Sequence, residues 1–376
     1  MLPHRSRTGV AALFVLLALS SCGGGAASDS PPPALAGNEF GIAARPTNST
    51  CRPPAQPMQP PVSLRATGCV DATAPTHPAP GLIPYGVASP LWSDGAAKQR
   101  FMALPEGARI HVVAAGAGGT TDEGHFDFPV GTVLMKSFLF AGKLIETRLF
   151  SKTRVDSWTG TSYAWNDEQS DATLVSQDGT TKSITNDGGK SQDWTFPSRS
   201  DCLLCHNDVV GFSLGLETRQ LNILFDYPSH VRANQIATLE HIGVFDGPVR
   251  ALPPLPDPGA GSDPATLDDR AHSYLHANCA ICHRPGGNFP GIDMRYGVAL
   301  ADMKLCGLEV TKGTAGALPP EAARRLVPAH PEQSVTYTRM ATVDTTVRMP
   351  QIATAVVDPV GTPLIAAWIK SIAACP

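Results

Sequence analysis

The chain has 376 residues and a formal net charge of −4, from 33 acidic and 29 basic side chains. Its length allows a sizeable core and suits two domains rather than one. The acidic balance disfavours nucleic acid as a partner, because nucleic-acid binding depends on clustered positive charge.

The first segment has the pattern of an export signal. Arg5 and Arg7 precede the apolar run VAALFVLLAL at 10 to 19, which is too short to cross a membrane as a helix. The run ends in Leu-Ser-Ser-Cys, which resembles a bacterial lipobox with cleavage before Cys22 and acylation of its thiol. A plain secretory signal with an incidental cysteine is the alternative. We predict a signal peptide over 1–21 and a lipoprotein in the bacterial cell envelope, where Gly23 favours the periplasmic side of the outer membrane.

The next segments are a tether and a β domain. Residues 22–50 are rich in glycine and proline and too poor in apolar residues to fold, so we predict a flexible tether. From there to residue 197, period-two alternation predicts a sandwich-like all-β domain over 51–197. Its strands are predicted in the runs RIHVV, TVLMKSFLF, KLIETRLF, SYAWN and ATLVS. Four tryptophans are expected in its core or at its rim: Trp92, Trp158, Trp165 and Trp194.

Helical patterns follow residue 197. Helices are predicted in LGLETRQLNILF, RANQIATLEHIG, ATLDDRAHSYLHAN and PLIAAWIKSIAA. A proline-rich linker at 253–264 divides this part into a first segment at 198–252 and a second at 265–376. The predicted fold class is therefore multidomain, with an all-β domain followed by a mainly α-helical region.

Two pentapeptides carry the chemistry: CLLCH at 202–206 and CAICH at 279–283. Two thiols separated by two residues can add to both vinyl groups of a haem, and the next histidine then faces the iron as its first axial ligand. A zinc site or a dithiol redox pair is the alternative, but neither explains a histidine after both pairs. We therefore predict two covalently bound haem c groups, held by Cys202, Cys205 and His206 and by Cys279, Cys282 and His283.

The sixth iron ligand decides whether a haem only transfers electrons or also binds a small molecule. For the second haem we predict Met349, because it lies in VRMPQ before a terminal helix, as in a small class I cytochrome c. A core-filling role is the alternative for Met349, and its weaker rivals as ligands are Met294, Met303 and Met340.

The first haem lacks a comparable methionine, and its sixth position stays open at this point. It could be empty, or it could be filled by His230, His241, His125, Met102, Met135 or Lys136. His272 and His276 resemble a metal pair by their spacing. Because no carboxylate cluster lies near them in the sequence, we expect them to pack or hydrogen-bond beside the second haem.

Cysteines of an exported protein are expected to be bonded or ligated. Of the nine cysteines, Cys22 takes lipid and four belong to the two pentapeptides. Four cysteines permit three connectivities, and proximity in the chain favours disulfides between Cys51 and Cys69 and between Cys306 and Cys375.

Several longer runs are familiar: YGVASPLWSDGAAKQRFMALPEG, FDFPVGTVLMKSF, LIETRLF, SYAWNDEQSDATLV, FPSRSDCLLCHN, LGLETRQLN and YLHANCAICHRPGG. They resemble a family of bacterial two-haem c-type cytochrome lipoproteins with an N-terminal β domain. The similarity extends from about residue 85 to the C-terminus. It implies an exported haem protein whose C-terminal part is like a class I cytochrome c. It also suggests a parallel β-helix protein as a partner.

The function expected from the sequence is electron transfer between periplasmic or membrane partners, a redox donor and a redox acceptor. Covalent haem supports this, and the sequence offers no nucleophile or acid–base constellation. One alternative is a dihaem peroxidase-like enzyme with an open first haem. Another is a β domain that binds carbohydrate or a protein partner, with the haems as accessories.

The lipid anchor depends on one thiol, so Cys22→Ala should abolish acylation. We expect the variant to move from the detergent phase to the aqueous phase in detergent partitioning, or to remain unprocessed. Wild-type partitioning of the variant would refute the lipoprotein assignment.

Overall fold

The computed structural model describes a single compact unit that begins at Phe40. Cys22, the signal and residues 22–39 of the tether lie outside the described residues, as do residues 260–264 of the predicted linker. No helix within the described part of the chain is long and apolar enough to cross a membrane. The described ranges are 40–113, 123–250, 252–259, 265–310, 318–319, 322–352 and 354–376.

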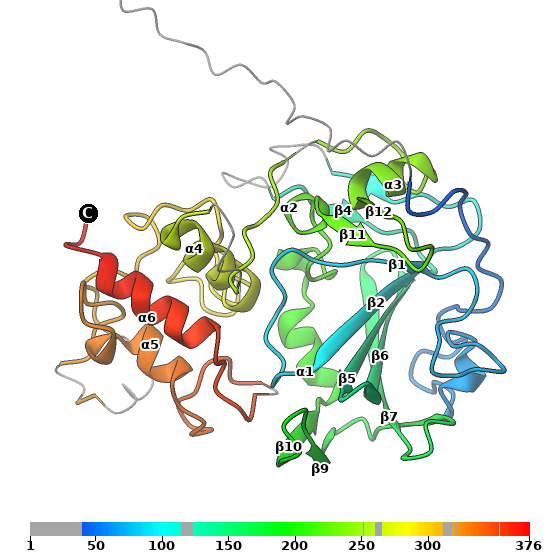
Figure 1. Cartoon of the computed structure of the whole chain (residues 1–376), viewed down its shortest axis with the longest axis horizontal. Helices are drawn as coiled ribbons and strands as arrows, with labels where there is room; N and C mark the ends of the chain where they lie inside the picture. Colours follow the sequence, from blue (N-terminus) through cyan, green and yellow to red (C-terminus); the bar gives the residue numbers. More distant parts are fainter. Residues whose placement is uncertain are drawn as a thin grey trace, which may run out of the picture. The chain divides into compact units, whose positions relative to one another are not determined.

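A six-stranded antiparallel sheet dominates the first half of the unit, with strand order β1-β2-β5-β6-β7-β8 (Figure 1). Its strands are β1 (Ile83–Pro84), β2 (Ala97–Ala103), β5 (Val133–Phe140), β6 (Lys143–Arg154), β7 (Ser157–Trp165) and β8 (Ala172–Leu174). Three two-stranded sheets accompany it. They pair β3 (His111–Val112) with β4 (Phe126–Asp127), β9 (Thr180–Thr185) with β10 (Ser191–Phe196), and β11 (Leu224–Asp226) with β12 (Arg232–Asn234).

Both faces of the large sheet are buried, because successive side chains along its strands belong to two different hydrophobic cores, one on each face. On β5, Leu134 joins a core with residues of the 216–245 stretch, whereas Met135 joins a core with the loops at 51–82. Irregular segments and short helices therefore cover the faces of the sheet, where a second sheet would pack in a sandwich. The expected sandwich is wrong for this reason. Trp158, Trp165 and Trp194 are buried.

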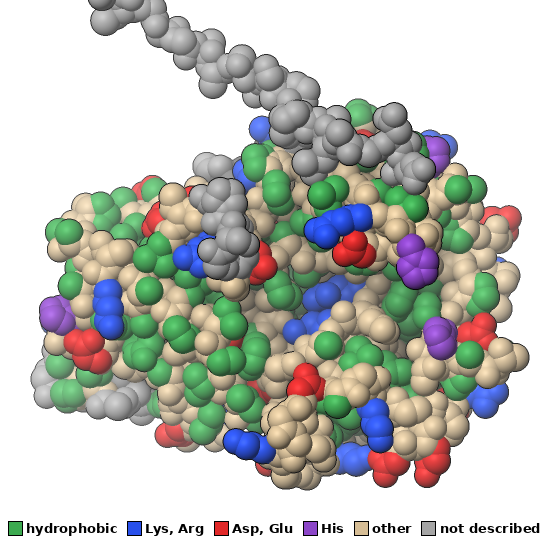
Figure 2. Space-filling model, viewed as in Figure 1, with side chains coloured by type: hydrophobic (Ala, Val, Ile, Leu, Met, Phe, Trp, Pro, Cys, Tyr) green, Lys and Arg blue, Asp and Glu red, His purple; other side chains and the backbone are tan. Residues whose placement is uncertain are grey.

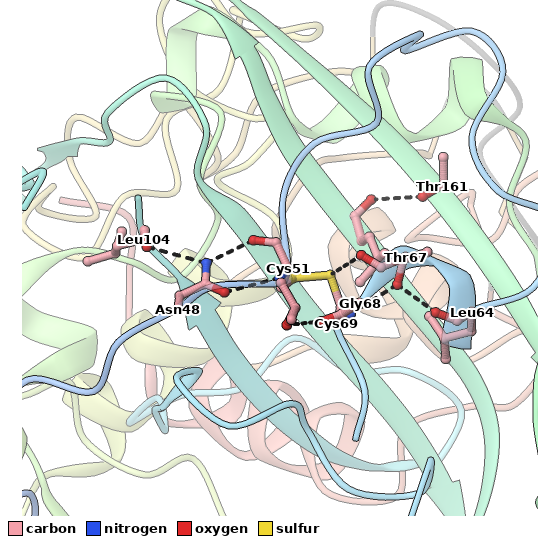
Figure 3. The surroundings of a disulfide bond; sticks show 10 residues. Asn48, Cys51, Leu64, Thr67, Gly68, Cys69, Leu104 and Thr161 are labelled. Atoms are coloured by element: carbon pink, nitrogen blue, oxygen red, sulfur yellow. Dashed lines mark hydrogen bonds between the residues drawn. A yellow bond between two sulfur atoms is a disulfide. The ribbon is translucent and has the colours of Figure 1, made fainter. Parts of the chain in front are cut away.

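A disulfide between Cys51 and Cys69 fastens the loops that cover the second face. Figure 3 shows Asn48 beside it. The Asn48 side chain donates to the carbonyls of Cys51, at 2.8 Å, and Leu104, at 3.3 Å, and its oxygen accepts from Cys51 N at 3.1 Å. A loop without regular structure therefore still has its buried polar groups paired, as burial demands.

The region after residue 197 is not mainly α-helical, and the expected helical cytochrome region is wrong. Among the residues that the structure describes, 18% are helical and 24% are in strands or bridges. Its helices are short and joined by long loops: α1 (Arg199–Cys205), α2 (Thr218–Leu221), α3 (Gln235–His241), α4 (Leu267–Asn278), α5 (Val335–Met340) and α6 (Gly361–Ser371).

The run LGLETRQLNILF shows why the helical pattern failed. Only one turn, α2, is helical, because its C-cap residue Asn222 donates to the Leu252 carbonyl at 2.7 Å and Leu224–Asp226 leaves to pair as β11. Apolar spacing over a few residues does not distinguish a helix from a loop that packs on a sheet. In the C-terminal region 265–376, α4, α5 and α6 share a small core with several loop residues. The Cys306–Cys375 disulfide closes that region.

One extended segment, 85–94, joins the sheet to the rest of the unit. Its first half is held by two buried glutamine side chains. Gln235 of α3 accepts from Gly86 N at 2.7 Å and donates to Gly86 O at 3.2 Å. Gln220 of α2 does the same for Ser89, with both distances 2.9 Å.

The second half of the 85–94 segment reaches the C-terminal region. Trp92 N donates to Asn278 Oδ1 at 2.7 Å, at the end of α4. The Asp94 carboxylate accepts from the backbone N–H groups of Ala355, at 2.9 Å, and Val356, at 3.0 Å. The segment therefore contacts α2, α3, α4 and the loop before α6.

Removal of one glutamine amide tests the importance of the 85–94 segment. Gln220→Ala should leave the buried N–H and C=O of Ser89 unpaired, which costs about 2–4 kcal/mol at roughly 1–2 kcal/mol for each group. Urea unfolding followed by far-ultraviolet circular dichroism should show that loss. Gln99→Ala, at an exposed position on β2, is the matched control and should change the free energy of unfolding by less than about 0.5 kcal/mol. Equal effects of the two substitutions would contradict the role of the segment.

Candidate functional site

A cavity of about 430 Å³ lies between the large sheet and the C-terminal region, and both CxxCH motifs line it. This volume falls in the range of cofactor and small-molecule sites. Figure 2 shows a hollow near the middle of the viewed face, between the two halves of the unit. The sequence alone gave no reason to place both motifs at one cavity.

The first motif lies on α1, which begins with a capping box. The Ser198 hydroxyl accepts from Asp201 N, and the Asp201 carboxylate accepts from Ser198 N, which fixes the start of the helix. Cys202 and Cys205 then lie one turn apart on one side of α1. The sheet allows this close packing because β7 has Gly160 there, where a Cβ atom would lie 2.8 Å from Cys202 Sγ.

His206 follows directly after α1 and is oriented by the backbone. Its Nδ1 donates to the Phe212 carbonyl at 2.6 Å, and its ring centroid is 4.2 Å from that of Phe150. Burial lowers the pKa of His206 to about 4, so the imidazole is neutral. A neutral imidazole with Nδ1–H bonded to a carbonyl leaves Nε2 as the metal-binding atom.

The second motif lies in the turn that ends α4. Cys279 N donates to Leu275 O at 2.8 Å and His283 N donates to Cys279 O at 2.9 Å, so the motif curls into one further turn. Burial lowers the pKa of His283 to about 4, with the positive charges of Arg325 and Arg339 acting in the same direction. His283 Nδ1 is buried without a hydrogen-bond partner among the described residues. His283 is therefore also a neutral candidate ligand.

The two motifs touch each other. The thiols of Cys205 and Cys282 lie close enough for each to shift the pKa of the other, raising that of Cys205 and lowering that of Cys282. Asn288 Nδ2 donates to Leu204 O at 2.9 Å between the two motifs. All four motif thiols are free. Among the described residues, the cysteines and histidines of the motifs do not gather three or more ligand atoms at one point, as tetrahedral zinc requires. The geometry therefore disfavours the zinc alternative.

Met349 lines the same cavity. Its rivals Met294, Met303 and Met340 are buried in the core of the C-terminal region and are absent from the lining of the cavity. Met349 N donates to Arg339 O at 2.9 Å, which fixes the start of the loop whose further end is bonded to Asp94. Of the methionines considered for the second haem, Met349 is thus the one that a ligand in the cavity can reach.

Of the six side chains considered for the sixth position of the predicted first haem, His125 and Lys136 line the cavity, and an empty position stays open as well. His230 lies in an exposed turn with a positive φ of 63°. His241 is exposed and stacks on Phe40 with ring centroids 3.8 Å apart. The remaining candidates, Met102 and Met135, are buried in the two cores of the sheet.

The structure also reveals a buried cluster of acidic and basic groups that the sequence did not show. Glu123 Oε2 lies 2.9 Å from His125 Nε2 and 3.1 Å from an Arg284 nitrogen. Glu217 Oε1 lies 2.7 Å from His276 Nε2. His276 is therefore hydrogen-bonded to a carboxylate that lies 59 residues away in the sequence, in a cluster of acidic groups that the sequence did not place near it.

Ligand atoms of Glu123, Glu217 and His276 lie within 4.8 Å of one another and could hold a metal ion. Burial would raise the pKa of Glu123, but its hydrogen bond to His125 and the positive charges of His276 and Arg284 lower it to about 2. The carboxylate is therefore ionised and already neutralised in part by its neighbours. His272 does not join this cluster; it packs edge-on against Trp368, with ring centroids 5.7 Å apart.

Comparisons with protein-family models, with curated proteins and with solved structures found no match to this chain.

Proposed function

We propose that the protein is an exported dihaem c-type cytochrome that transfers electrons between a donor and an acceptor in the bacterial envelope. The observation that carries the proposal is the shared cavity: both CxxCH motifs line it, and their cysteines are in contact. Two cofactors attached there would lie next to each other, so an electron could pass between them without leaving the protein.

The residues of the cavity fit haem in three respects. The thiols of each motif are free, and both histidines are half-buried and neutral, as covalent attachment and iron ligation require. Met349 supplies a thioether in the same cavity. When bound, haem supplies an iron that changes its oxidation state by one electron. The protein orients His206 through Phe212 and encloses the site between the sheet and α4.

The expected partners follow from the proposed location. A lipid on Cys22 would hold the protein at the membrane surface, facing periplasmic donor and acceptor proteins. A parallel β-helix protein is one candidate among them. Nucleic acid is not an expected partner, given the acidic balance of the chain.

A second candidate function, that of a dihaem peroxidase-like enzyme, is favoured by one observation. His125 and Arg284 both line the cavity, and both are bonded to Glu123. An imidazole can move a proton and a guanidinium can stabilise negative charge, as the reduction of a peroxide to water by two electrons and two protons requires. A high-spin ferric fraction that shifts with cyanide would favour this enzyme, whereas two low-spin haems inert to cyanide would favour the electron carrier.

The proposal predicts two covalent haems per chain in a pyridine haemochrome assay, with both retained in a denaturing gel. A double variant, Cys279→Ala with Cys282→Ala, should retain one covalent haem, because the first motif supplies its own two thiols and histidine on α1, whose start is fixed by a local capping box. The matching variant of Cys202 and Cys205 should retain the other. Zinc in place of haem in the wild-type protein would contradict the proposal.

Ligation by Met349 predicts a difference between the two haems. Thioether sulfur favours ferrous iron, so the second haem should have the higher potential and be reduced first. Met349→Ala should remove the weak sulfur-to-iron absorption band in the far red and lower the potential of one haem alone. Met340→Leu, in the core, is the control and should leave both unchanged. If Met349→Ala behaves like the control, Met349 is not a ligand.

A further inference from the structure

Three cationic side chains form a row across the large sheet. The register places Arg100 of β2 opposite Lys136 of β5, and Lys136 opposite Arg148 of β6. All three line the cavity. Figure 2 shows Lys and Arg side chains at the bottom of the hollow on the viewed face. We call Arg100, Lys136 and Arg148 the cationic row.

The cationic row holds more positive charge than its surroundings neutralise. Like charges directly opposite each other destabilise a sheet. Arg148 is paired, with its Nε 2.7 Å from Glu146 Oε1, but this carboxylate also accepts from Trp194 Nε1 at 3.0 Å. Within the described ranges, neither Arg100 nor Lys136 forms an ion pair with a carboxylate. Burial, together with the neighbouring Arg100, lowers the pKa of Lys136 well below its ordinary value.

The cationic row lies beside the first CxxCH motif. Lys136 and Arg148 are close enough to His206 to lower its pKa, in addition to the larger effect of burial. Arg148 also lies close enough to Cys202 and Cys205 to interact with their charges. A ligand held between this motif and the sheet would therefore contact the row. Negative charge on that ligand would relieve the repulsion between Arg100 and Lys136.

We propose that the cationic row is a carboxylate-binding site within the cavity. Guanidinium groups match the planar geometry of a carboxylate, and an ammonium group between them adds a third set of donors. The carboxylates have two possible sources: the propionates of a haem held by the first motif, or a small soluble dicarboxylate that enters the cavity. The first source rests on the proposed function, and the second does not.

The test compares Lys136→Gln and Arg100→Gln with Lys98→Gln in the full chain, purified with the cofactors it carries. Lys98 lies on the same strand as Arg100, opposite Phe138, and is not among the residues that line the cavity. It is close enough to Lys136 to lower the pKa of that lysine, so Lys98→Gln removes a nearby positive charge without removing a side chain of the row. Because the row repels itself, thermal unfolding should show no loss of stability in the two row variants. Covalent haem content, the propionate bending bands in the resonance Raman spectrum and calorimetric titration with succinate are then measured on each protein.

If the propionates occupy the row, Lys136→Gln and Arg100→Gln shift the propionate bands and lower the potential of one haem, while succinate does not bind the wild type. If a soluble dicarboxylate occupies the row, succinate binds the wild type. The row variants then bind succinate about tenfold more weakly or worse, because each has lost one charge-assisted hydrogen bond. The propionate bands then stay unchanged. Lys98→Gln behaves like the wild type in both cases.

The proposal is overturned if the row variants match Lys98→Gln in the Raman bands, the potentials and the succinate titration. The haem content separates this failure from that of the proposed function. If the wild type carries no covalent haem, the proposed function fails, and the carboxylate site is then tested by succinate binding alone. Succinate that binds the wild type but not Lys136→Gln supports the site. Succinate that does not bind the wild type overturns it.

Discussion

The arrangement of the cavity depends on the buried hydrogen bonds of the 85–94 segment. An extended segment that leaves a sheet must find partners for its backbone groups elsewhere, since an unpaired buried N–H or C=O is costly. Here the partners come from α2, α3, α4 and the loop before α6. Of these elements, α2, α4 and the loop before α6 contribute residues to the lining of the cavity. The segment therefore fixes the distance between the sheet, which packs against the first motif, and α4, which leads into the second.

The charges of the cavity follow from that arrangement. The sheet contributes the cationic row, and His125 and Arg284, which also line the cavity, belong to a buried cluster around Glu123. The cluster is nearly self-compensated, whereas the row is not. An anionic group is therefore favoured against the sheet, beside His206. Met349 also lines the cavity, so the cavity offers both a thioether and a cationic wall to a bound group.

Local chemistry in this protein could be read from the sequence, and long-range arrangement could not. The CxxCH motifs, the runs that form β5, β6 and β7, and the cysteine pairs nearest in the chain all depend on residues close in sequence. The cluster around Glu123 and His276 gave no signal, because an isolated bridge between His125 and Glu217 brings distant residues together. The cationic row depends on strand register, which alternation alone does not fix. The helical content was overestimated because apolar residues in loops at 216–245 are buried by the sheet and not by helix packing.

Circular dichroism of the Soret band tests most directly the proposal that two haems share one cavity. Two haems in contact couple their transitions and give a couplet of opposite signs, whereas isolated haems give single bands. We expect a couplet in the wild-type protein, and its loss in the variant that keeps only the haem of the first motif. A wild-type spectrum equal to the sum of the two single-haem variants would contradict the shared cavity.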